Sequence, residues 1–179
     1  MHYNSYLEVN LTQIKANAAA VQKSLPPGVA VIPVLKNDAY GMGMTRVFDA
    51  LRSSELRFTC VGAAHLSEGE ALRRHLQGAG RKCDILLLGA VPNGLESRAV
   101  SAGLIPSLSS PQQAERFARA VVSRHGGAGR RPVQIEINTG LNRFGAKPGT
   151  QLALLAEAII AHPQLEVTGA FAHMSLLDV

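Results

Sequence analysis

Short apolar segments typical of buried strands alternate with longer segments of helical periodicity along the whole chain. This alternation is typical of α/β folds, in which helical crossovers join parallel strands. We predict strands over six apolar segments, residues 29–35, 59–63, 84–88, 105–108, 133–137 and 167–172. We predict helices over residues 11–25, 45–51, 67–76, a short segment from 93, 111–125 and 151–161. Repeating units of about 25 residues fit either a doubly wound open sheet or a (β/α)8 barrel.

Capping patterns indicate where several of these helices begin. Asn10 stands in front of the first helix, where its side-chain oxygen can accept a hydrogen bond from the first turn. Ser67 and Glu70 have the spacing of a capping box, which predicts that the third helix begins there. Ser110 and Gln113 have the same spacing, and the proline between them suits a first helical position.

Chain length separates the two candidate architectures. The chain has 179 residues. A closed (β/α)8 barrel takes about 250 residues, and about 200 is its lower limit. An open sheet of six strands would be complete at this length, so length alone favours a Rossmann-like or flavodoxin-like sheet. Because both folds bind ligands beyond the carboxyl ends of their strands, the residues at those ends decide between them.

Composition limits the classes of partner. Hydrophobic residues make up 46% and charged residues 17%, as in ordinary globular proteins. The net charge is +5, but aromatic residues are only 4% and like charges form no block, so we expect no nucleic-acid partner. No apolar run approaches the roughly 20 residues of a membrane helix, and the N-terminus resembles no signal peptide, so we expect no membrane and a cytoplasmic location. Cys60 and Cys83 match no metal-ligand spacing, so we expect no metal.

The segment after the first predicted strand contains the most reactive residues. It reads KNDAYGMG, from Lys36 to Gly43. A lysine amine held at the mouth of an α/β fold is partly shielded from water, which favours its neutral, nucleophilic form and a Schiff base with an aldehyde. A strand-end lysine that simply reaches solvent is the alternative. The glycine pair is not a dinucleotide fingerprint, because Arg46 occupies the position of the third glycine.

Three motifs together resemble one family. Residues 34–43, VLKNDAYGMG, resemble the pyridoxal-phosphate lysine motif of the alanine racemase family. Residues 136–145, EINTGLNRFG, resemble its second signature, and residues 169–174, GAFAHM, resemble its third. The opening LEVNL of residues 7–11 is similar to the start of that family. The motifs follow strands in the right order, so the chain is identified as a member of the family.

The resemblance implies a fold and a set of site residues. The fold is a (β/α)8 barrel, of which residues 1–179 are the N-terminal pyridoxal-phosphate-binding part with about six β/α units, without the family's C-terminal β domain. Lys36 would hold the cofactor as an aldimine and act as one catalytic base, and Tyr40 would contact the cofactor phosphate. Arg143 would face the cofactor's phenolic oxygen and the substrate carboxylate, and His173 would join the hydrogen bonds behind the pyridine ring.

The implied activity is interconversion of L- and D-alanine with pyridoxal 5'-phosphate, in a homodimer that takes a small amino acid as substrate. Many family members have a lysine, often carbamylated, at the position of Glu136, and we hypothesise that glutamate supplies the same negative charge beside Arg143. The family's second base is a tyrosine from the dimer partner, which Tyr3, Tyr6 and Tyr40 do not match. We therefore expect a fragment that racemises poorly by itself.

Three alternatives remain open from the sequence. A pyridoxal-phosphate-binding protein of the same superfamily could serve vitamin homeostasis without racemase activity. A nucleotide-binding open sheet would fit the length but has no phosphate motif. A racemase for serine, lysine or ornithine would share the same motifs.

Overall fold

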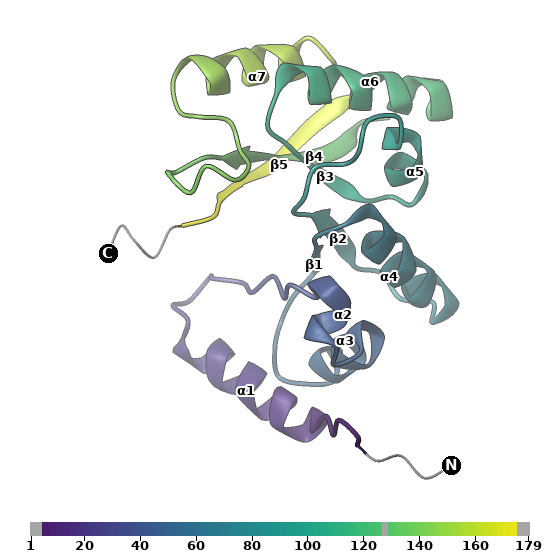
Figure 1. The fold of residues 1–179 in the computed structure, drawn as a ribbon, viewed down its shortest axis with the longest axis vertical. Helices are drawn as coiled ribbons and strands as arrows, with labels where there is room; N and C mark the ends of the chain where they lie inside the picture. The colour runs from purple at the N-terminus through teal and green to yellow at the C-terminus, as the bar shows by residue number, and fades with distance from the viewer. Residues whose placement is uncertain (1–4, 127–128, 175–179) are drawn as a thin grey trace.

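The computed structural model describes residues 5–126 and 129–174 as alternating helices and strands (Figure 1). Their order is α1 (Leu11–Ser24), α2 (Lys36–Tyr40), α3 (Met44–Arg52), β1 (Cys60–Ala63), α4 (Leu66–Gly78), β2 (Asp84–Leu87), α5 (Glu96–Ser101), β3 (Ile105–Leu108), α6 (Pro111–His125), β4 (Arg131–Ile137), α7 (Thr150–Ile160) and β5 (Leu165–Ala172). The predicted α/β class is confirmed.

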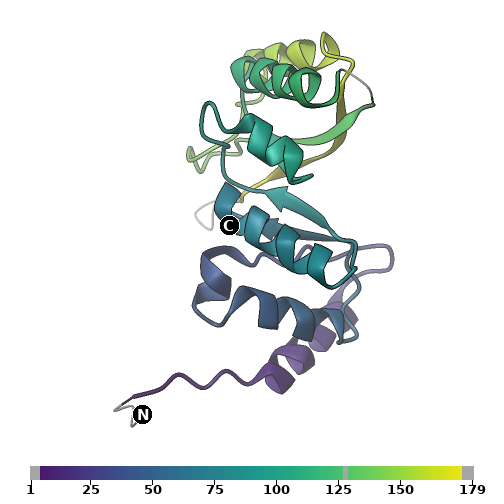
Figure 2. The same ribbon diagram turned by 90° about the vertical axis from the view of Figure 1, so that its right-hand side faces the viewer.

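The five strands form one parallel sheet in the order β1-β2-β3-β4-β5, which is also their order along the chain. A doubly wound sheet reverses its strand order at a switch point and has helices on both faces. Here the crossover helices α4 to α7 stand in a row along one face of the strands (Figure 2). This single winding is that of an incomplete (β/α)8 barrel, and the open-sheet architecture that length favoured is wrong.

The first predicted strand, residues 29–35, is reduced to one bridge between Val34 and Gly62. The Gly62 N–H donates to the carbonyl of Pro33 at 2.8 Å, and the Leu35 N–H donates to the carbonyl of Gly62 at 2.8 Å. Proline has no N–H to continue a ladder, so pairing does not extend toward the start of this segment. The bridge is parallel, and it leaves Lys36 at the carboxyl edge beside β1.

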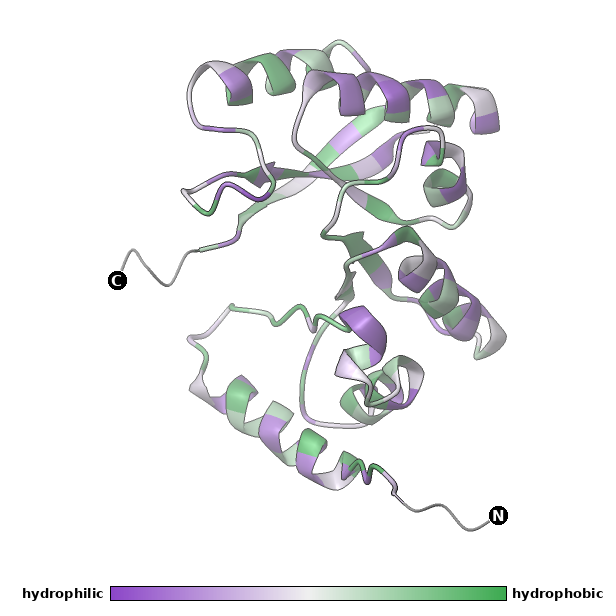
Figure 3. Cartoon of the chain, viewed as in Figure 1, coloured by the Kyte–Doolittle hydropathy of each residue, from purple (hydrophilic) through white to green (hydrophobic). Residues whose placement is uncertain are grey.

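The hydrophobic core lies between the sheet and the helices. Its largest fully buried side chains include Phe48 of α3, Leu72 and Leu76 of α4, and Ile85 and Leu87 of β2. Figure 3 shows β2 as mostly hydrophobic, whereas α6 alternates between hydrophilic and hydrophobic residues. Such alternation is expected of a helix that packs one face on a sheet and exposes the other.

Two of the three predicted helix caps are present. The Asn10 side chain accepts a hydrogen bond from the Gln13 N–H at 2.9 Å, and the Ser110 hydroxyl accepts one from the Gln113 N–H at 3.4 Å. The Ser67–Glu70 capping box is wrong, because α4 begins at Leu66 with His65 as its N-cap.

The residue that reaches back from the first turn of α4 is Glu68. Its carboxylate accepts a hydrogen bond from the His65 N–H at 3.1 Å. Glu70 instead forms an ion pair with Arg98 of α5. Equal spacing therefore gave a false box two residues beyond the true one.

Within residues 5–126 and 129–174, no helix is long and apolar enough to cross a membrane. The same residues contain no cluster of histidine, cysteine and carboxylate side chains that could hold a metal ion.

Leu72→Ala should lower the free energy of unfolding by about 2–5 kcal/mol, because it leaves a cavity in a fully buried site. Chemical denaturation would measure the loss. Leu154→Ala in α7 is the matched control, since that leucine is 50% exposed and its loss should cost about 0.5 kcal/mol or less. Equal losses at both positions would contradict this location of the core.

Candidate functional site

The segment that begins at Lys36 forms a left-handed turn rather than an ordinary helix. The φ angles of Asn37, Asp38, Ala39 and Tyr40 are 53°, 52°, 52° and 56°. In residues other than glycine, the Cβ atom disfavours this backbone conformation by about 1–2 kcal/mol per residue. Such strain persists only where the surroundings enforce it, and it often marks functional sites.

Hydrogen bonds inside the segment close the turn. The Ala39 N–H donates to the carbonyl of Leu35 at 3.1 Å, and the Gly43 N–H donates to the carbonyl of Asp38 at 3.0 Å. The Asp38 carboxylate accepts a bond from the Met44 N–H at 2.7 Å, which ties the turn to the first residue of α3. Gly43, with φ 87°, adopts a positive-φ conformation that a glycine permits just before that helix.

The turn brings two of the sequence-predicted site residues together. The Lys36 amine lies 5.7 Å from the centre of the Tyr40 ring. Lys36 is half-buried, whereas the Tyr40 side chain is 65% exposed. The amine and the phenol therefore lie next to each other at the carboxyl edge of the sheet.

Three further residues line one narrow hollow at the carboxyl ends of β4 and β5. They are Glu136 within β4, Arg143 in the loop after it, and His173 directly after β5. The Thr139 hydroxyl joins the two loops by donating to the carbonyl of His173 at 3.3 Å. Arg143 and His173, predicted from separate motifs, thus face the same space.

The loop that presents Arg143 folds back onto the end of β4. The Ala146 N–H donates to the carbonyl of Glu136 at 2.9 Å, and the Asn138 N–H donates to the carbonyl of Ala146 at 3.0 Å. Gly145 makes this closure possible, because its φ is 96° and a Cβ there would lie 2.6 Å from the Asn138 nitrogen. The second signature therefore encodes a tight loop around Arg143.

Burial and charge act in opposite directions on Glu136. Its side chain is buried, and burial raises the pKa of its carboxyl above the usual range. The positive charge of Arg143 lowers the same pKa, but by less than burial raises it. Among the residues described, the two side chains form no direct ion pair. Glu136 can therefore supply negative charge to the hollow once it ionises.

The two groups share an edge of the sheet without a direct link. All strands are parallel, so the segment after Val34 and the loops after β4 and β5 emerge on the same side. No hydrogen bond among residues 5–126 and 129–174 joins Lys36 or Tyr40 to Arg143 or His173. A ligand that touches both groups must span the space between them.

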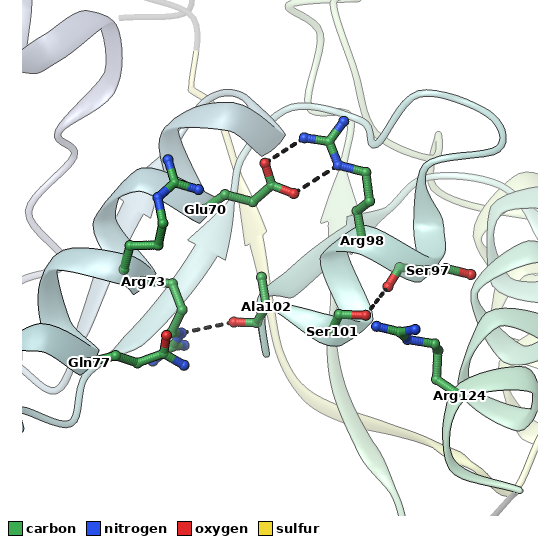
Figure 4. A pocket seen from close by; sticks show the side chains of 9 residues that line it. Glu70, Arg73, Gln77, Ser97, Arg98, Ser101, Ala102 and Arg124 are labelled. Atoms are coloured by element: carbon green, nitrogen blue, oxygen red, sulfur yellow. Dashed lines mark hydrogen bonds and ion pairs between the residues drawn. The ribbon is translucent and has the colours of Figure 1, made fainter.

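A larger cavity, of about 560 Å³, lies away from this edge, between α4, α5 and α6 (Figure 4). Glu70 accepts hydrogen bonds from two nitrogens of Arg98 at 2.9 and 2.6 Å, and Arg73 donates to the carbonyls of Ala102 and Gly103, both at 2.8 Å. Most of its charged groups are thus engaged in holding α4 against α5. This arrangement explains the cavity as a feature of helix packing.

Sequence reasoning missed two residues that shape the site. Glu68 accepts a hydrogen bond from the Asn37 N–H at 2.6 Å, and Asn138 accepts bonds from the Gly140 and Asn142 N–H groups at 3.0 and 3.2 Å. A glutamate soon after a predicted strand was the available signal for Glu68. The false capping box that pairs Ser67, directly before Glu68, with Glu70 obscured that signal.

Glu136→Gln should remove one source of pH dependence from folding stability. Because the pKa of Glu136 is raised in the folded state, its contribution is fully present below the pKa of an unfolded glutamate and is lost as pH rises through the folded value. The difference in unfolding free energy, wild type minus Glu136→Gln, should therefore fall as pH rises above about 4, the pKa of an unfolded glutamate, and through the raised folded value. Urea titrations at several pH values would measure it, with the exposed Glu115→Gln as control. A difference that stays constant with pH would contradict the prediction.

The comparisons with known proteins agree on one family. The model for the alanine racemase N-terminal domain matches residues 9–179. The alanine racemase of Helicobacter pylori strain Shi470 is 30% identical over 174 residues, which cover 97% of this chain and 44% of that protein.

Solved structures give the same result. The alanine racemase from Streptomyces coelicolor A3(2) superposes with a TM-score of 0.82 at 30% identity, over 94% of this chain and 43% of that one. The alanine racemase from Bartonella henselae with covalently bound pyridoxal phosphate shares the fold, with a TM-score of 0.78 at 22% identity over 94% and 46%. The chain spans less than half the length of each of these relatives. By its family match and its fold, the chain belongs to the alanine racemase family.

Proposed function

We propose that this chain forms the cofactor-binding part of a pyridoxal-phosphate-dependent racemase that interconverts L- and D-alanine. The observation that supports this most is the strained turn that holds the Lys36 amine beside the Tyr40 phenol. The turn lies at the same edge of the sheet as Arg143 and His173. Family membership supports the racemase class, and relatives such as the Helicobacter pylori alanine racemase support alanine as the substrate.

The side chains at this edge fit pyridoxal phosphate by their chemistry. Lys36 offers an amine that can bond to an aldehyde, Tyr40 offers a phenol that can donate to a phosphate oxygen, and Arg143 offers a planar set of donors. In this proposal Lys36 holds the cofactor, Tyr40 contacts its phosphate, and His173 belongs to the hydrogen bonds behind the ring. When bound, the cofactor supplies an electron sink that stabilises negative charge at the substrate Cα.

The protein side chains then orient the substrate and move its proton. The Arg143 guanidinium binds the substrate carboxylate through parallel hydrogen bonds, which fixes the direction of the Cα–H bond. The Lys36 amine takes or returns the proton at Cα from one face. Ionised Glu136 attracts Arg143 and so holds the guanidinium in the hollow.

Racemisation needs a second proton donor on the opposite face of Cα. We place that group outside these residues and treat the chain as the N-terminal barrel domain of a longer, homodimeric, cytoplasmic enzyme. The coverage of 44% of the Helicobacter pylori relative is compatible with this division.

Pyridoxal phosphate added to the purified chain, followed by borohydride reduction and peptide mapping, should give a covalent adduct at Lys36. Lys36→Arg should abolish that adduct, because a guanidinium does not bond to the aldehyde. Mass spectrometry of the peptides would measure the yield at each lysine. Adducts spread evenly over Lys36 and the other lysines, Lys15, Lys23, Lys82 and Lys147, would contradict the proposed role of Lys36.

The 179-residue chain should not racemise alanine above the rate of free pyridoxal phosphate, because only one face of Cα has its base. Chiral chromatography of L-alanine incubations would test this, with serine, lysine and ornithine in parallel. Turnover by the chain alone would contradict the division of the two bases. A longer form that binds the cofactor but racemises none of these amino acids would favour the vitamin-homeostasis alternative.

A further inference from the structure

The carboxylate of Glu68 lies where two loops of the barrel meet. One oxygen, Oε1, accepts a hydrogen bond from the Asn37 N–H at 2.6 Å. The other, Oε2, accepts bonds from the Ala64 and His65 N–H groups at 2.9 and 3.1 Å. One half-buried side chain thus joins the Lys36 turn to the loop between β1 and α4.

The bond to Asn37 acts on the residue that directly follows Lys36. Asn37 is the first left-handed residue of the turn, and the bonds within the turn use its carbonyl but not its N–H. The Asn37 N–H therefore forms its bond with a different part of the fold. A carboxylate acceptor makes this bond stronger than one between neutral groups. It fixes the peptide plane from which the Lys36 side chain extends.

Helix capping alone does not explain this arrangement. Glu68 is the third residue of α4, where a carboxylate satisfies free N–H groups and favours the positive end of the helix. Its bonds to Ala64 and His65 meet that need, whereas Asn37 lies in another loop. Gln113 is the third residue of α6 and accepts a bond from the Ser109 N–H at 2.6 Å. Gln113 therefore occupies the same capping position as Glu68, but it forms no hydrogen bond with the Lys36 turn.

We propose that Glu68 is a positioning residue that directs the Lys36 amine, an inference that rests on the proposed role of Lys36 in cofactor binding. Glu68 holds the backbone beside Lys36 in its left-handed conformation. Release of this bond misplaces the amine. Because reactivity depends steeply on the placement of the reacting atom, the misplaced amine reacts more slowly. Glu68 itself touches neither cofactor nor substrate in this role.

The test compares Glu68→Ala with the matched control Gln113→Ala in the 179-residue chain. Glu68→Gln is the second variant, and it keeps the side-chain size if Glu68→Ala fails to fold. A glutamine has a single carbonyl oxygen, so it cannot accept the bonds on both sides. Two quantities are measured: the ratio of borohydride-trapped pyridoxal phosphate at Lys36 to that at Lys147, followed against pH, and amide hydrogen exchange of the peptide that contains Asn37.

We expect both Glu68 variants to lower the Lys36-to-Lys147 ratio about tenfold and to speed exchange at Asn37 about tenfold. Gln113→Ala should change neither quantity. A ratio that stays unchanged in a Glu68 variant whose exchange at Asn37 has become faster, or one that Gln113→Ala lowers equally, would show that Glu68 only caps α4 and would overturn the inference. Absence of a Lys36 adduct in the unaltered chain would overturn the proposed function and this role with it. An adduct insensitive to Glu68 overturns this inference alone.

Discussion

Parallel pairing of each strand with the next one along the chain sets the position of every candidate site residue. Because β1 to β5 run in the same direction and in chain order, their carboxyl ends share one edge. The Val34–Gly62 bridge adds the segment before Lys36 to that edge with a single parallel contact. Motifs more than a hundred residues apart in sequence therefore emerge on one side of the sheet, which no local property of either motif would produce.

The Lys36 turn shows how the rest of the fold supports a strained segment. Four consecutive left-handed residues cost about 1–2 kcal/mol each, and two of them, Asp38 and Asn37, are held by hydrogen bonds that involve carboxylates. Such bonds contribute about 1.5–3 kcal/mol each. The anchors and the strain are thus of similar size, so the conformation depends on α3 and α4 being in place. Folding of the barrel and shaping of the site are linked through these two helices.

The sequence was sufficient where the signal was local. Asn10 predicted the start of α1, and the apolar segments predicted all five strands of the sheet. It was misleading where a partner lay far away in the chain. The Ser67–Glu70 pair had the right spacing, but the bond from Asn37 to Glu68 spans 31 residues and lies outside any capping pattern. Residues 29–35 looked like a strand by composition, yet Pro33 could not continue a ladder. Chain length favoured an open sheet, which is wrong. The order in which strands pair decides how a sheet winds, and chain length does not report that order.

Glu136 and Arg143 show that the parallel pairing of the strands also affects the electrostatics of the site. Glu136 belongs to β4 and is buried there, which disfavours its charged form, whereas Arg143 stands on the exposed loop that folds back over the strand end. The resemblance to the family implies a carbamylated lysine at this position in many members, where negative charge arises from a covalent modification. In this chain the charge opposite Arg143 depends on a proton instead. Under the proposed function, the strength with which Arg143 binds the substrate carboxylate therefore depends on the protonation of one buried side chain, Glu136.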